Sequence, residues 1–359
     1  MTQLTQTPSL LTIGLDVGDR TTHLCVLDGE RQVAWRGRCE TRREALQEAL
    51  APYPGSRVIL EAGSQSHWMA AALQAWGCLP HVVDPRRVAL IAKDPRKCDR
   101  RDAESLARLG LGCPELLGRV HHRDEATQAD LSLVRTRDLL VRTRTRVIQQ
   151  VRGLCKVFGV RLPSCSAEAF GRRMGAQIPE LLAPAVEPLL GLLADLHVRL
   201  EASDRRLKEL AQTRYREATE RVAQPHGVGP VTSVAFVLTL ADPARFAHSR
   251  DVGSWVGLCP RNSASGDRAP QLGISKCGDG YLRRLLVQDA HYILGHFGKD
   301  SDLRRFGLRL VARGGAGAKQ RAAVAVARKL AVLLHRLWVS GQPYEPLHQA
   351  SLQTALASA

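Results

Sequence analysis

The sequence has few aromatic residues, and none of its nine cysteines is paired at Cys-x-x-Cys spacing. Aromatic side chains make up 4% of the 359 residues, so the cores must be built mainly from leucine, valine and alanine. An odd number of scattered cysteines argues against a disulfide framework. The spacing also argues against a structural zinc site. Reduced thiols in the cytosol are the simple interpretation.

Long apolar runs are missing as well. No stretch reaches the roughly 20 consecutive apolar residues that a transmembrane helix needs. The N-terminus lacks the basic-then-apolar order of a secretory signal. We therefore expect no membrane partner and a cytoplasmic location.

Acidic residues are outnumbered. The chain has 35 Asp and Glu against 51 Lys and Arg, a formal net charge of +16 and a pI of about 10. Such an excess is typical of a protein that neutralises the phosphates of nucleic acid. The alternatives are a generically basic protein and one that touches an anionic membrane. We favour nucleic acid, because basic residues recur in every segment.

Four acids in the first third of the chain form the most informative pattern. Asp16 and Glu61 each end an apolar run, while Asp99 and Asp102 stand three residues apart at the start of a helical pattern. Two carboxylates this close repel each other, which requires a bound cation or exposure to solvent. Hard cations such as Mg²⁺ or Mn²⁺ prefer oxygen ligands. The four acids therefore predict a metal site for phosphoryl transfer.

The same region indicates a fold. The pattern predicts strands over 10–16, 23–27, 32–35 and 57–61, and a helix that Thr41 caps and that ends near Leu50. Glu44, three residues after Thr41, has capping-box spacing. Three strands, a helix and another strand, with acids closing the first and fourth strands, is the order of the RNase H/RuvC-like α/β fold.

Residues 126–220 show no strand signal and predict long helices. Two neighbouring rows recur every seven residues, as in a coiled coil: Leu133, Leu140, Val147 and Leu154, beside Val134, Val141 and Ile148. Arg137 and Arg144 fall between the apolar rows. They either extend along the apolar surface to water or face a nucleic-acid backbone, and the sequence does not choose between the two.

The last third contains glycine turns and a small polar loop. Gly227 and Gly229 resemble a helix-hairpin-helix turn, in which backbone N–H groups approach a phosphate. Ser263 and Ser265 lie in a loop flanked by arginines that could stabilise charge on a phosphodiester. By composition alone, the alternative is that these serines are solvated turn residues. As further candidate nucleic-acid contacts we take the basic residues Arg261, Arg268, Lys276 and Arg283, with a solvated surface as the alternative for Arg283. His291 and His296, five apart, are interpreted as structural.

Taken in order, the motifs resemble one family along nearly the whole chain. The matching pieces are 14–17, 60–62, 84–87, 97–103, 227–230, 257–261, 265–266, 273–283 and 327–330. The chain resembles the DEDD-type transposases of the insertion-sequence family that includes the Piv/MooV invertases, also called bridge-RNA recombinases. Cys98 departs from the family pattern, which usually has a small polar residue before the third acid.

The resemblance implies a domain organisation and a set of site residues. It implies a RuvC-like domain (1–125), a helical coiled-coil middle (126–222), a mainly helical transposase domain (223–345) and a tail (346–359). Asp16, Glu61, Asp99 and Asp102 would be the metal ligands. Ser265, with Ser263 as its neighbouring rival, would be the nucleophile that forms a phosphoserine link to DNA. Acids and serine lie on separate domains, which fits a composite site across protomers.

The resemblance also implies partners. These are double-stranded DNA at the element ends and the target, a structured non-coding guide RNA, and further copies of the chain in a dimer or tetramer. The location would be the bacterial cytoplasm, at the nucleoid. Three alternatives stay open: a RuvC-like junction nuclease that hydrolyses with water, a site-specific DNA invertase, and a non-catalytic nucleic-acid-binding protein. The intact set of four acids argues against the last.

Overall fold

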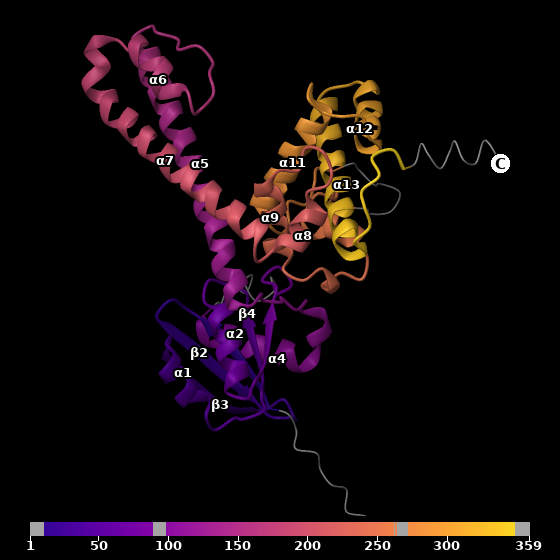
Figure 1. Cartoon of the computed structure of the whole chain (residues 1–359). Helices are drawn as coiled ribbons and strands as arrows, with labels where there is room; N and C mark the ends of the chain where they lie inside the picture. Colours follow the sequence, from indigo (N-terminus) through magenta and orange to yellow (C-terminus); the bar gives the residue numbers. More distant parts are fainter. Residues whose placement is uncertain (1–10, 89–97, 262, 264–271, 349–359) are drawn as a thin grey trace, which may run out of the picture. The chain divides into compact units, whose positions relative to one another are not determined.

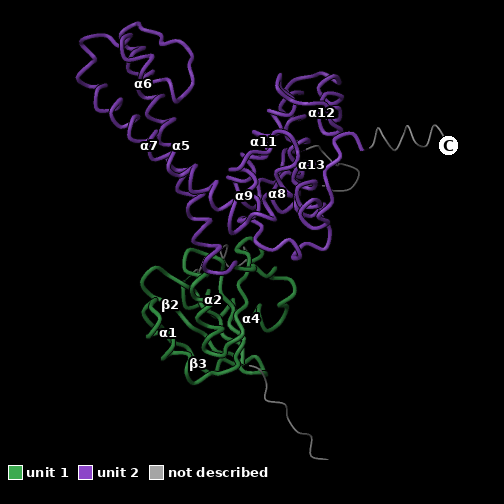
Figure 2. Tube along the Cα trace, viewed as in Figure 1, with its two compact units in different colours: residues 1–122 green, residues 123–359 purple. Residues whose placement is uncertain are grey.

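The computed structural model describes residues 11–88, 98–261, 263 and 272–348. The chain divides into two compact units, residues 1–122 and 123–359, which Figure 2 shows in green and purple. Unit 1 is a mixed α/β domain and unit 2 is helical. The expected fold class is confirmed as an N-terminal mixed α/β domain followed by a mostly helical region. The predicted division of the second unit into a middle and a C-terminal domain stays a prediction.

Unit 1 is built on a five-stranded sheet. Its order is β3-β2-β1-β4-β5, in which β2 pairs antiparallel with β1 and β3, while β4 runs parallel to β1 and β5. The strands are β1 (Thr12–Val17), β2 (Thr21–Leu27), β3 (Val33–Glu40), β4 (Arg57–Glu61) and β5 (Leu79–Val83). Along the chain, three strands, a helix and a fourth strand follow one another as predicted, and β5 adds a fifth strand.

Helices cover both faces of this sheet. α1 (Arg43–Leu50) and α2 (Ser66–Ala75) pack with Ile13, Leu15 and Leu60 on one face. α4 (Asp99–Gly112) packs on the other face. Side chains alternate along a strand, so Gly14 and Asp16 of β1 face α4, as do Ile59 and Glu61 of β4.

The predicted capping box at the start of α1 is wrong. The N-cap residue is Arg42, and its side chain caps nothing. The Thr41 hydroxyl instead bonds to the carbonyl oxygen of Gly18 at 3.0 Å and to the Thr22 hydroxyl at 2.9 Å. Thr41 therefore ties the end of β3 to the β1–β2 turn.

Unit 2 consists of helices joined by connections of different lengths (Figure 1). Its α-helices are α5 (Glu125–Val157), α6 (Phe170–Met174), α7 (Ala183–Gln212), α8 (Arg216–Val222), α9 (Pro230–Leu240), α10 (Arg250–Trp255), α11 (Gly280–Leu294), α12 (Asp302–Ala312) and α13 (Ala318–Ser340). α9 is buried from Thr232 to Leu240. A helix that is apolar on every side forms the centre of a core, and α11 and α13 pack around it.

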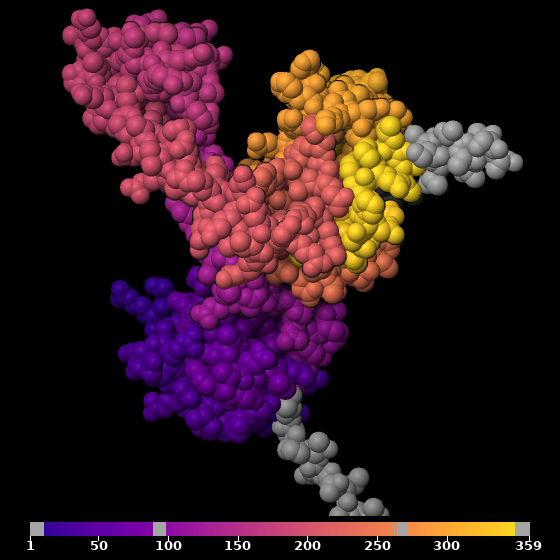
Figure 3. Space-filling model, in the orientation of Figure 1, coloured from indigo at the N-terminus to yellow at the C-terminus, as the bar shows by residue number. Residues whose placement is uncertain are grey.

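The two longest helices of the middle region pair antiparallel. Leu131 near the start of α5 packs with Leu207 near the end of α7, while Val151 packs with Val186. Figure 3 shows the far part of this hairpin standing clear of α11–α13. The predicted heptad row that begins at Leu133 lies at the edge of the contact, because Leu133 is 37% exposed. In the second predicted row, Val134 and Ile148 are buried. A coiled coil stays a prediction.

One stretch of the described residues, Glu180–Gln212, is long and apolar enough by length and composition to span a membrane. It contains α7. Its buried leucines, such as Leu193 and Leu207, pack against α5 and the adjoining core. Only 22% of the apolar window is buried, so packing within unit 2 accounts for part of the apolar composition of α7.

Candidate functional site

The first two acids of the predicted site stand side by side in the sheet. β1 and β4 are parallel, and Leu15 lies opposite Leu60. One step further in the same register places Asp16 beside Glu61. Neighbouring strands are about 4.8 Å apart, and both side chains face α4. The carboxyl ends of two parallel strands thus present a pair of partly buried acids.

The other two acids, Asp99 and Asp102, are part of α4. Gly14 makes the approach of this helix possible, because a Cβ there would lie 2.6 Å from the Ala107 nitrogen and closer still to the Ala103 oxygen. Arg57, at the start of β4, donates to the Gly110 carbonyl at 3.3 Å. The C-terminal end of α4 therefore lies over the starts of the strands, and its N-terminal end points toward their carboxyl ends.

Helical periodicity then places each acid. Leu106 packs with Ile59, so Asp102, one turn earlier, lies toward Glu61, two residues later in β4. Ala103 packs over Gly14 in the same way, so Asp99 lies toward Asp16. Asp102 is only 7% exposed, while Asp99 is exposed.

The donor chemistry of this edge fits a hard divalent cation, because its candidate ligands are all carboxylates. Within 11–88, 98–261, 263 and 272–348, however, no group of three or more His, Cys, Asp or Glu side chains is placed so that it could hold a metal ion. The fold gathers the backbone positions of the quartet at one edge but does not bring the carboxylates to one point. The metal site stays a prediction.

The serine loop of unit 2 has a well-defined base. The Arg261 N–H donates to the Gly273 carbonyl at 3.0 Å, and Pro260 pairs with Ile274. Gly257 has a φ of +77°, and a Cβ there would meet the Cys277 backbone. Ser263 and Arg261 are exposed. Ser265 and Arg268 lie outside the described residues.

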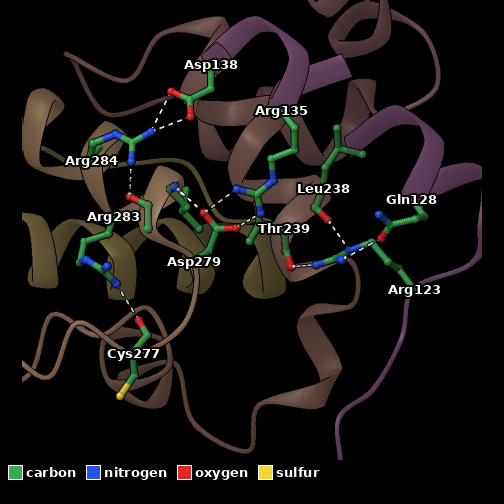
Figure 4. A network of polar contacts seen from close by, with 12 residues as sticks. Arg123, Gln128, Arg135, Asp138, Leu238, Thr239, Cys277, Asp279, Arg283 and Arg284 are labelled. Carbon is green, nitrogen blue, oxygen red and sulfur yellow. Dashed lines mark hydrogen bonds and ion pairs between the residues drawn. The ribbon is translucent and has the colours of Figure 1, made fainter. Parts of the chain in front are cut away.

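The segment 273–284, which contains the family motif 273–283, is held by an ion-pair network that Figure 4 shows. Asp279 caps α11 by accepting from the Leu282 N–H at 2.7 Å and pairs with Arg135 of α5. Both Asp138 oxygens accept from Arg284 at 2.7 Å. The two acids are largely buried, so the network fixes α5 on α11. The sequence did not reveal this role.

Several predicted nucleic-acid contacts have partners inside the protein. Arg137 pairs with Asp204, and Arg144 with Glu168 at 3.1 Å. Lys276 adopts a left-handed φ of 55°, and its N–H donates to Gly257. Gly229 is the N-cap of α9. These contacts give each of the four residues a role within the fold. Nucleic-acid binding by these residues stays a prediction.

Arg283 also has internal partners, because its guanidinium donates to the Cys277 carbonyl at 2.6 Å and to the Val256 carbonyl at 2.8 Å. We expect Arg283→Ala to lower the free energy of unfolding by about 2 kcal/mol, since two buried acceptors lose a charged donor. Urea denaturation of the full-length chain measures this. Lys276→Ala, which removes no side-chain bond of this kind, is the control. A stable Arg283 variant whose DNA binding loses salt dependence would instead support a phosphate contact.

α13 lines a groove of about 1510 Å³ that the sequence did not predict. Leu258, Phe306 and Val332 contribute apolar surface, and both ends of the serine loop border the groove. Among its cations, Arg328 and Arg336 are exposed on α13 and form no hydrogen bond or ion pair with the described residues. Their spacing of eight residues places them on one side of the helix. This basic groove can accept a polyanion.

Comparisons with known proteins agree with the order of these features. Residues 13–158 match the model of the IS110 DEDD transposases, described as "Transposase", and residues 219–304 match the model described as "Transposase IS116/IS110/IS902 family". The transposase for insertion sequence element IS1328 of Yersinia enterocolitica is 31% identical over 79% of this chain and 84% of its own length. The chain belongs to this transposase family.

Two further transposases are similar over nearly their whole length. The transposase for insertion sequence element IS1111A of Coxiella burnetii is 28% identical over 92% of this chain and 90% of its own length. The probable family 20 transposase of Pseudomonas aeruginosa is 29% identical over 94% and 99%. The transposase match at 13–158 includes all four acids, and the match at 219–304 includes the base of the serine loop.

Proposed function

We propose that this protein cuts and rejoins DNA at the ends and the target of its insertion sequence, with Ser265 as the nucleophile and the acidic quartet in support. The closer relation to the Piv/MooV invertases, a structured guide RNA and assembly as a dimer or tetramer belong to the same proposal. The observation that carries it is the placement of Asp16, Glu61 and the start of α4 at one edge of a RuvC-like sheet.

In the proposed reaction, the serine oxygen forms a bond to the phosphorus of a DNA phosphodiester while a bond to one DNA oxygen breaks. That oxygen takes up a proton and leaves as a hydroxyl. Attack by a hydroxyl of another strand on the phosphoserine then rejoins DNA and frees the serine. Asp16, Glu61, Asp99 and Asp102 would hold Mg²⁺ or Mn²⁺, which supplies charge stabilisation at the phosphate. The basic groove beside the loop supports the binding of the DNA phosphates.

A RuvC-like junction nuclease is the second candidate, because the acidic edge by itself supports hydrolysis by water. The two candidates differ in whether a covalent protein–DNA intermediate forms. A site-specific invertase would share the serine chemistry and differ in its DNA products. The position of the acids in the fold is compatible with all of these reactions. An experiment on the DNA products is needed to distinguish them.

We expect Ser265→Ala to abolish covalent attachment to DNA, since the attacking oxygen is gone, whereas Ser263→Ala retains it. Asp16→Asn should lower the cleavage rate at least 100-fold, the order of effect of losing one charge-stabilising group. Denaturing gels of labelled DNA carrying the element ends measure both. Cleavage by Ser265→Ala with no covalent product in the wild type would favour the nuclease. Full activity of Asp16→Asn, or resistance to chelation, would contradict the metal proposal.

A further inference from the structure

Four rings form a cluster on the surface of unit 2, although aromatic residues are scarce in this chain. Tyr292 and Phe297 stack with ring centroids 6.3 Å apart and planes inclined by 22°. His226 lies 5.5 Å from Tyr292, and His296 lies 5.2 Å from Phe297. Phe297 is 72% exposed and Tyr292 is 43% exposed. Burial of a phenylalanine side chain typically contributes about 1.5–3 kcal/mol, so leaving it exposed forgoes stability.

The surrounding backbone holds these rings in place. Gly227 has a φ of +105°, and a Cβ there would lie 3.1 Å from the Tyr292 ring. The His226 ring bonds to the Phe297 carbonyl at 3.1 Å. Arg304 donates to the Ile293 and Gly295 carbonyls at 2.5 and 2.7 Å, which fixes the end of α11 and the loop after it. The Gly227 turn thus packs against a ring, and the platform is preformed.

The charges around the rings favour a polyanion. His291 and Lys299 are exposed beside the cluster, together with the two histidines of the cluster itself. Of the two nearest acids in the chain, Asp300 is paired with Arg305 at 2.7 Å and Asp289 is buried, with 7% of its surface exposed. The histidine rings are inclined to their neighbours by 56° and 73°, so they border the Tyr292–Phe297 pair edge-on. Exposed aromatic rings beside basic side chains are the arrangement on which nucleobases stack.

We propose that the ring platform formed by His226, Tyr292, His296 and Phe297 stacks an unpaired base of the DNA strand. The inference rests on the proposed function, because strand exchange requires bases to leave one partner strand before they pair with another. Base–aromatic stacking is sequence-tolerant, since every base has a π face. The platform would therefore favour DNA with unpaired bases over fully paired DNA without reading its sequence.

The test compares binding of the full-length protein to a paired duplex and to the same duplex with a short single-stranded DNA tail. We expect Phe297→Ala and Phe297→Leu to weaken binding of the tailed DNA by about tenfold, as for the loss of one stacked base. Binding of the paired duplex should not change. Phe297→Trp, which keeps a flat ring, should retain the preference. The matched control is Leu308→Ala on α12, where an apolar side chain of 42% exposure is removed outside the ring cluster.

Three results would overturn the inference. Wild-type affinity in Phe297→Leu together with a loss in Phe297→Ala would indicate apolar docking in place of stacking. Equal losses for tailed and paired DNA, or no loss for either, would also contradict it. A loss confined to an RNA tail would overturn the assignment to DNA. The assay uses uncleaved DNA and needs no catalysis, so a failure of cleavage and a failure of stacking are separate outcomes.

Discussion

Replacing Gly14 with alanine is expected to lower the free energy of unfolding of unit 1 by about 3 kcal/mol, the upper end of the range for overpacked cores. The added Cβ would collide with the backbone of α4 at Ala103 and Ala107. Backbone atoms cannot rotate away as a side-chain end can, so the helix itself must move. Because α4 carries Asp99 and Asp102, we also expect cleavage of DNA to be lost. Urea denaturation and hydrogen exchange at the α4 amides measure the structural effect.

Gly112→Ala is the matched control. Gly112 is the last residue of α4, at the end opposite to Asp99 and Asp102, and a Cβ there meets no atom within 4 Å. Alanine has a higher helix propensity than glycine by up to about 1 kcal/mol, so stability should stay the same or rise. If Gly14→Ala were as stable and active as Gly112→Ala, α4 would not pack on β1 as described, and the argument for the acidic edge would fail.

Replacing Asp289 with asparagine is expected to stabilise the protein in a manner that depends on pH. Asp289 of α11 is 7% exposed. One of its oxygens accepts from the Thr232 hydroxyl at 3.2 Å, and the other has no hydrogen-bond partner among the described residues. Burial raises the pKa of this carboxyl from 3.8 to about 7. A shift of this size corresponds to roughly 4 kcal/mol between the two protonation states.

The direction of this pH dependence follows from whether the folded or the unfolded chain holds the Asp289 proton. Between pH 3.8 and about 7, the folded protein keeps Asp289 protonated while the unfolded chain has released the proton, so stability falls as the pH rises. Above pH 7 the cost of the buried charge is fully present. The stability difference between Asp289→Asn and the wild type should therefore grow from pH 4 to pH 7 and then level off. Urea denaturation at a series of pH values measures it.

A matched carboxyl tests whether this slope comes from burial. Asp300→Asn removes an exposed carboxylate whose pKa is lowered, chiefly by its hydrogen bond to Arg305. Loss of that ion pair should reduce stability slightly near neutral pH, which is opposite in sign to the expected gain at Asp289. A difference between Asp289→Asn and the wild type that stays constant with pH would show that the carboxyl titrates normally.

Local patterns predicted much of unit 1. Apolar runs closed by Asp16 and Glu61 gave the central strands, because a buried strand needs consecutive apolar residues and ends where polarity returns. The predicted capping box is absent because the Thr41 hydroxyl bonds to Gly18 and Thr22 at the β1–β2 turn. In unit 2, periodicity predicted long helices and two neighbouring apolar rows, but it did not show which row is buried. Neighbouring rows on a helix differ little in apolarity, and only the partner helix selects the buried one.

The sequence by itself determined the chemistry available to this protein: four acids, a serine loop, an excess of positive charge and the order of motifs that marks the transposase family. Only the tertiary structure decided how several of those residues are used. Arg283 and Arg284 form internal bonds, and Gly227 packs against a ring. The reason is physical, because an arginine or a glycine has the same local signal whether it meets a phosphate, a carbonyl or an aromatic side chain. Which one it meets depends on segments distant in the chain.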